Sequence, residues 1–181
     1  ANPFFSALLK AIQAAAHNMG SRVMVADTQF DAATEIEIVK KFAASVDAAV
    51  LCSPVASTAG LLAAAGSTQL VFVNRAAVRV PSVVVDQAEI VNLAVDHHRQ
   101  LGHRHIAVVT GPSSYWSSAQ RLRAAQRLGA VHVIDNADPT FEGGAKVLGS
   151  LLDADITAVV AFNDLMALGI LRAAVDHGLS V

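Results

Sequence analysis

Short, almost wholly apolar runs alternate in this chain with longer stretches of helical period, and this alternation limits the folds open to it. A strand that is apolar at every position is typical of a parallel sheet covered by helices on both faces. The expected strands are residues 22–26, 48–52, 70–73, 83–85, 106–110, 131–134 and 158–161. Strands that alternate with helices predict a doubly wound α/β fold with right-handed crossovers.

The stretches between the strands carry apolar residues at helical spacing. The first places Phe5, Leu8 and Ile12 on one stripe and stops at Gly20, and the second follows Asp31, a suitable N-cap. Further helices are expected at residues 58–65, 88–101, 118–128, 141–152 and 165–177.

The chain is expected to form two similar units. A first series covers residues 1–101, and a second, over residues 102–181, begins after the polar stretch Gly102-His103-Arg104-His105. The second series stops at Val181, where its rhythm calls for another strand, so we expect its C-terminal part to be truncated. The stretch from Arg123 to Val131 is also short for a helix, a loop and a strand.

The composition excludes several classes of function. Of 181 residues, 54% are apolar and 15% charged, which suits a domain with a sizeable core. No apolar run is long enough to cross a bilayer, so no membrane association is expected. A net charge of −2 argues against nucleic-acid binding by this chain alone. The single cysteine, Cys52, fits a reducing compartment, and we expect a cytoplasmic protein.

Polar residues follow the expected strands, and in open α/β sheets ligands bind beyond the carboxyl ends of the strands. These residues are Asp27-Thr28, Ser53-Pro54, Asn74-Arg75, Gly111-Pro112-Ser113-Ser114 and Asn163-Asp164. No strand is followed by a dinucleotide, P-loop or nucleophile-elbow motif. The sequence therefore predicts a binding protein that is not an enzyme and uses no cofactor.

Aromatic rings and arginines are candidates to join these polar residues. Phe5 is expected in the core, whereas Phe4 lies off the apolar stripe and offers a face to a ligand. Trp116 precedes Arg121 and Arg123, whose guanidinium groups suit hydroxyls or carboxylates. A solvated helix arginine is an equally good interpretation of either one.

Three further groups of residues have structural interpretations. Asp164 is expected to cap the last helix, which leaves the amide of Asn163 for a ligand. His103 and His105 alternate near His97-His98, but a metal site needs a third ligand, and we expect surface or helix-end histidines and no metal. Cys52 ends a buried strand, so it is expected to be an apolar filler.

An ordered set of stretches resembles the effector-binding core of LacI/GalR-family transcription regulators, a fold related to periplasmic sugar-binding proteins. The stretches are Asn2-Pro3-Phe4-Phe5, Ser53-Pro54, Phe72-Val73-Asn74-Arg75, Val80-Pro81-Ser82-Val83, Gly102-His103-Arg104-His105, Gly111-Pro112, Arg121-Leu122-Arg123, Phe141-Glu142-Gly143-Gly144 and Ala161-Phe162-Asn163-Asp164.

The resemblance implies two Rossmann-like subdomains around a small-molecule effector, a sugar or a nucleoside-like compound. It also implies a homodimer and an N-terminal helix-turn-helix headpiece, absent from this chain, that binds operator DNA. By this resemblance Phe4, Phe5, Arg123 and Asn163 are effector-binding residues. Ser53 and Asn74 are added to them because they follow expected strands, and Trp116 because it precedes the arginines. The chain departs from the family at Pro139, where many members carry an aromatic ring. The alternative is a periplasmic-type sugar-binding protein of a transport system.

Overall fold

A computed structural model describes residues 3–181 and divides the chain into two units, Ala1–Val83 and Val84–Val181. The division precedes helix α4 (Gln87–Gln100), whereas the sequence placed the boundary after it, near Gly102. The physical reason is packing, because Val91 and Val95 of α4 are fully buried in a core of the second unit. None of the described helices is both long and apolar enough to cross a bilayer.

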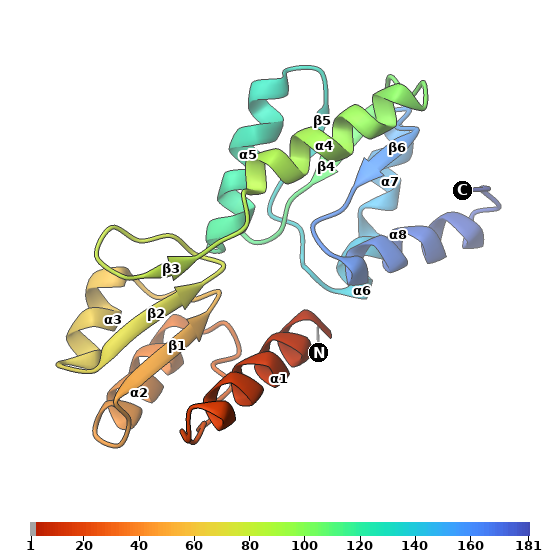
Figure 1. Ribbon diagram of the computed structural model, residues 1–181. Helices are drawn as coiled ribbons and strands as arrows, with labels where there is room; N and C mark the ends of the chain where they lie inside the picture. The colour runs from red at the N-terminus through yellow and green to blue at the C-terminus, as the bar shows by residue number, and fades with distance from the viewer. Residues whose placement is uncertain (1–2) are drawn as a thin grey trace. The chain divides into compact units, whose positions relative to one another are not determined.

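The N-terminal unit contains a parallel sheet of three strands (Figure 1). Its elements are α1 (Pro3–Asn18), α2 (Ala32–Ala43), β1 (Ala48–Cys52), α3 (Thr58–Ala65), β2 (Gln69–Val73) and β3 (Ser82–Val83). The strands follow the order β1-β2-β3, so the chain adds each new strand beside the previous one. This arrangement puts the ends of β1 and β2 next to each other.

One face of this sheet carries the core of the unit. Val39 of α2 and Leu61 of α3 are buried against Leu51 and Phe72 of the strands. Val50, on the opposite side of β1, is 46% exposed. The prediction of strands buried on both faces is therefore wrong for β1 in the described unit.

The apolar stripe expected on α1 is the half-buried side of that helix, although none of its residues is fully buried. Phe5 on this stripe contacts Phe30, with ring centroids 5.7 Å apart.

The strand expected at residues 22–26 does not form, which corrects the sequence-based prediction. This segment has no regular secondary structure, and Met24 and Val25 are 55% and 57% exposed. A β-strand exists through hydrogen bonds to a neighbouring strand. Within residues 3–181 no strand pairs with this segment, so its apolar pattern alone does not produce a strand.

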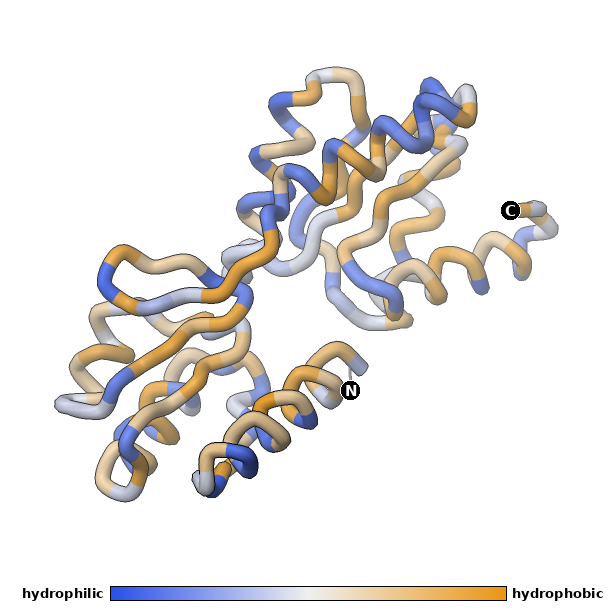
Figure 2. Tube along the Cα trace, viewed as in Figure 1, coloured by the Kyte–Doolittle hydropathy of each residue, from blue (hydrophilic) through white to orange (hydrophobic). Residues whose placement is uncertain are grey.

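The C-terminal unit contains a second parallel sheet, with the order β5-β4-β6. Besides α4 its elements are β4 (Ile106–Val109), α5 (Trp116–Leu128), β5 (His132–Ile134), α6 (Phe141–Lys146), α7 (Leu148–Asp153), β6 (Ala158–Val160) and α8 (Asp164–Asp176). Ile106 and Val108 face one buried cluster, and Ala107 and Val109 face the other. Both faces of central strand β4 are buried, as predicted, and the hydrophobic colour runs along β6 beside it (Figure 2).

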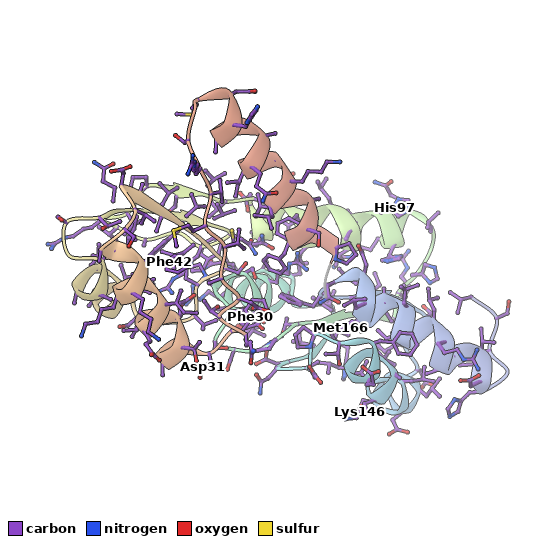
Figure 3. The ribbon with its side chains drawn as sticks, turned by 90° about the horizontal axis from the view of Figure 1, so that it is seen from below. Phe30, Asp31, Phe42, His97, Lys146 and Met166 are labelled. Atoms are coloured by element: carbon purple, nitrogen blue, oxygen red, sulfur yellow. The ribbon has the colours of Figure 1, made fainter. Side chains whose placement is uncertain are left out.

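Glycines allow α6 and α8 to pack closely. A side chain at Gly144 would overlap the backbone of Met166, and one at Gly169 would overlap the carbonyl oxygen of Phe141. Figure 3 labels Lys146 at the end of α6 and Met166 in the first turn of α8. The single helix expected over residues 141–152 is interrupted at Val147, which separates α6 from α7.

Candidate functional site

Two of the predicted binding residues meet at the carboxyl ends of β1 and β2. The amide Nδ2 of Asn74 donates a hydrogen bond of 2.9 Å to Oγ of Ser53. Both residues have positive φ angles, 61° and 55°, a region that asparagine tolerates better than most residues do. Both side chains are half-buried. The N-terminal unit thus presents a paired hydroxyl and amide at the edge where α/β proteins bind ligands.

A buried carboxylate holds the loop that follows Ser53. Glu35 on α2 is 3% exposed, and its Oε2 accepts hydrogen bonds from the backbone N–H groups of Val55 at 3.0 Å and Ala56 at 2.8 Å. These contacts fix the backbone two and three residues after Ser53. Glu35 is not among the residues predicted from the sequence, although its position four residues before buried Val39 places it on the inner face of the helix.

An arginine holds the same loop through its carbonyl groups. Arg75 Nη1 donates to the carbonyl oxygens of Pro54 at 2.9 Å and Ala56 at 2.6 Å, and Nη2 donates to Oγ1 of Thr58 at 3.1 Å. Its guanidinium also lies 5.6 Å from the ring centroid of Phe72. Glu35 and Arg75 together satisfy donors and acceptors of this loop, so Ser53 is presented from a fixed backbone.

In the C-terminal unit Asn163 is the N-cap of α8, which corrects the expectation that Asp164 would cap this helix. Its Oδ1 accepts from the backbone N–H of Met166 at 2.8 Å, and Nδ2 donates to the carbonyl oxygen of Pro139 at 2.9 Å. The amide is therefore held in place. One N–H and one lone pair of the amide remain beyond these two bonds.

The two arginines of α5 differ sharply in their surroundings. Arg121 donates through Nε to Oε1 of Gln87 at 2.7 Å and through Nη1 to the carbonyl oxygen of Phe162 at 2.7 Å. Its guanidinium lies 5.1 Å from the ring centroid of Phe162, and burial lowers its pKa. Arg123 is exposed, and within residues 3–181 its side chain makes no hydrogen bond or ion pair. Arg121 is committed to the fold, whereas Arg123 is available to a ligand.

The surroundings of the aromatic candidates do not show whether their rings contact a ligand. Phe4 is 50% exposed, and its ring stands edge-on to that of Phe5 with centroids 5.2 Å apart. Trp116 is half-buried at the start of α5. Asn2, which opens the first family stretch, lies outside the described residues. Ligand contacts by these rings stay a prediction.

Histidines gather at the amino end of β4. His103 Nδ1 lies 3.0 Å from Oγ1 of Thr157, and its ring stands edge-on to that of His98. In residues 3–181 no three histidine, cysteine or acidic side chains converge as metal ligands do. Cys52 is half-buried and burial raises the pKa of its thiol, so the thiolate form is disfavoured.

We expect His98 to make the C-terminal unit less stable in acid. Burial, followed by the nearby His103 and His97, lowers the pKa of His98 below its usual 6.5, and its Nδ1 is buried without a hydrogen-bond partner. Because the charged form is disfavoured in the fold, this stability is present above pH 6.5 and is lost as the pH falls toward the lowered pKa. Urea midpoints of the wild type and His98→Gln, measured at about pH 7.5 and 5.5, should converge in acid.

The exposed His17 at the end of α1 provides the control for this experiment. His17→Gln should show the same acid-induced loss as the wild type. An equal loss in His98→Gln and the wild type would contradict the assignment to His98.

Similarity to known proteins decides the family. A family model described as "Periplasmic binding proteins and sugar binding domain of LacI family" matches residues 1–181. The chain belongs to this family. The HTH-type transcriptional repressor CytR of Escherichia coli K12 is 29% identical over 193 residues, which cover 99% of this chain and 57% of that protein. The family members that it matches are transcription regulators, which are not enzymes.

Solved structures agree with this membership. A LacI transcriptional regulator from a Rhodococcus species is 32% identical, with a TM-score of 0.84 and 99% of this chain and 70% of that chain covered. A LacI-family regulator from Enterococcus faecalis with bound ribose shows the same fold at 22% identity, with a TM-score of 0.87 and the same coverage. This LacI-family chain spans between 32% and 58% of the length of the curated relatives it matches.

Proposed function

We propose that this chain senses a small-molecule effector, a sugar or a nucleoside-like compound, for a LacI-type transcription regulator. The hydrogen-bonded pair of Ser53 and Asn74 carries the proposal, because a hydroxyl and an amide are fixed together at the ends of two parallel strands. Glu35 and Arg75 support it by holding the loop after Ser53. A loop that is held in place by several hydrogen bonds is typical of binding sites on a rigid scaffold.

The side chains at the strand ends suit a neutral ligand rich in hydroxyl groups. Ser53, Asn74 and Asn163 offer both donors and acceptors, and the Arg123 guanidinium offers a planar set of donors. Phe4, Phe5 and Trp116 supply apolar surface of the kind that packs on sugar rings and bases. A ribose-bound structure of the same fold supports the sugar class.

The regulator as a whole would act by linkage between effector and DNA. An effector that binds one arrangement of the protein more tightly shifts the population toward it and thereby changes DNA affinity. We propose that the protein is a cytoplasmic homodimer and contacts operator DNA through an N-terminal headpiece. The net charge of −2 supports a DNA contact outside this chain. A transport role is not favoured, since the curated relatives are regulators.

Calorimetric titration of the intact protein with a panel of sugars and nucleosides tests this proposal. For any compound that binds, Arg123→Ala should weaken affinity about tenfold or more, because a hydrogen bond from a charged group is lost. Its unfolding midpoint should not change, since the Arg123 side chain is exposed. Arg121→Ala should instead lower the midpoint, because Gln87 and the Phe162 carbonyl lose a partner.

Arg127→Ala is the matched control, as Arg127 is exposed on the same helix. Its affinity should equal that of the wild type. Absence of binding across the panel, or a loss of equal size in Arg123→Ala and Arg127→Ala, would contradict the proposed site.

A further inference from the structure

A second candidate site lies at the opposite ends of the strands in the C-terminal unit. Here a shallow pocket of about 330 Å³ is lined by Ile106, the first residue of β4, and His132, the first residue of β5. Ile156, just before β6, lines it as well. The pocket therefore sits at the amino ends of the sheet, away from the carboxyl ends that carry Asn163.

The short connection from α5 to β5 borders this pocket, through Gly129, Ala130 and Val131. Gly129 ends α5 in the left-handed conformation, with φ of 65°, and β5 begins three residues later at His132. His132 is paired with Ala107 of β4, whose side chain faces the buried cluster containing Leu151. Although its strand neighbour is buried, the imidazole of His132 is exposed, because β5 is an edge strand and starts directly after the turn.

Three basic side chains line the pocket, and none is neutralised. Arg104, His105 and His132 are exposed, and across residues 3–181 no ion pair or hydrogen bond engages their side chains. Asp153 ends α7 and Asp155 follows Ala154, but neither lines the pocket.

We propose that this pocket binds the phosphate group of a small anionic metabolite. A guanidinium can bind two phosphate oxygens at once, and two imidazoles approaching from β5 and from the segment before β4 can donate to the third oxygen and to a bridging one. The volume is at the lower end of the range for small-molecule pockets. The site goes beyond the proposed effector function and does not depend on it.

The test is an NMR titration of the intact protein with inorganic phosphate and with sulfate, against sodium chloride at equal ionic strength. We expect saturable shifts of the backbone amides at residues 104–106 and 129–132 with both anions and not with chloride. Arg104→Gln should weaken this binding about tenfold.

Arg79→Gln is the control, since Arg79 is an exposed arginine of the N-terminal unit. It should leave both titrations unchanged, and His132→Gln should weaken the binding of both anions. Equal shifts with chloride, or wild-type affinity in Arg104→Gln, would overturn the proposal. The proposal would also be overturned if duplex DNA shifted the same amides at a lower concentration of phosphate groups than free phosphate does. That result would indicate a nucleic-acid-binding surface. The effector titration is tested with variants of other residues, Arg123 and Arg127. The proposed effector function and the proposed phosphate site can therefore fail independently.

Discussion

Replacing Gly169 with alanine is expected to lower the free energy of unfolding of the C-terminal unit by about 3 kcal/mol, the upper end of what overpacking usually costs. The added Cβ would overlap the backbone carbonyl oxygen of Phe141 and crowd the backbone N–H of Ala145. Backbone atoms cannot rotate away as a side chain does, so α6 and α8 have to separate. Chemical denaturation followed by circular dichroism measures the effect.

Gly149 provides a matched control, because it lies in α7 with open space around its Cα. The same substitution there should raise stability by up to about 1 kcal/mol, since alanine is the better helix former. Gly144→Ala should behave like Gly169→Ala, as its Cβ would overlap the backbone of Met166. Equal stability of Gly169→Ala and Gly149→Ala would show that the two helices are not in close contact.

This contact also bears on the candidate binding site. Asn163 immediately precedes α8, and its amide donates to Pro139, two residues before α6 begins. A shift of α8 against α6 therefore moves Asn163 relative to Pro139. Gly169→Ala should weaken effector binding even under conditions in which the protein stays folded.

Local patterns in the sequence predicted much of the fold. The bounds of β1 and α3 are those expected, because an apolar run and a Ser57 cap are both local signals. The segment at residues 22–26 has an equally good strand pattern and forms none, since pairing with a neighbour is not local information. Its exposed valine and methionine show that pattern alone is insufficient.

The candidate site was predictable only where topology determines it. Ser53 and Asn74 each follow a strand, so a parallel sheet brings them together whatever their side chains do. The choice between Asn163 and Asp164 as the cap depended on one backbone turn and was wrong. Glu35 was missed because its partners are backbone N–H groups about twenty residues away, which have no sequence signature.

Removal of the Glu35 carboxylate is the second change with a large expected effect. In Glu35→Ala the part-buried N–H of Val55 and the buried N–H of Ala56 lose their acceptor, and an unsatisfied buried donor costs about 1–3 kcal/mol. We therefore expect the free energy of unfolding of the N-terminal unit to fall by about 3 kcal/mol. Glu35→Gln keeps an acceptor oxygen in the same place, because Oε2 alone accepts both bonds. It should lower the free energy of unfolding by about 1 kcal/mol, because the acceptor is no longer charged.

Measuring effector affinity distinguishes a role of Glu35 in the binding site from a purely structural role. Because Val55 and Ala56 lie two and three residues after Ser53, the loosened loop in Glu35→Gln should weaken effector binding in protein that remains folded. Glu37→Gln on the same helix is the control, since within residues 3–181 Glu37 pairs only with exposed Lys41. This substitution should change neither stability nor affinity measurably. Wild-type stability in Glu35→Ala would mean that the loop finds other acceptors, and wild-type affinity in Glu35→Gln would mean that the effector does not depend on Ser53.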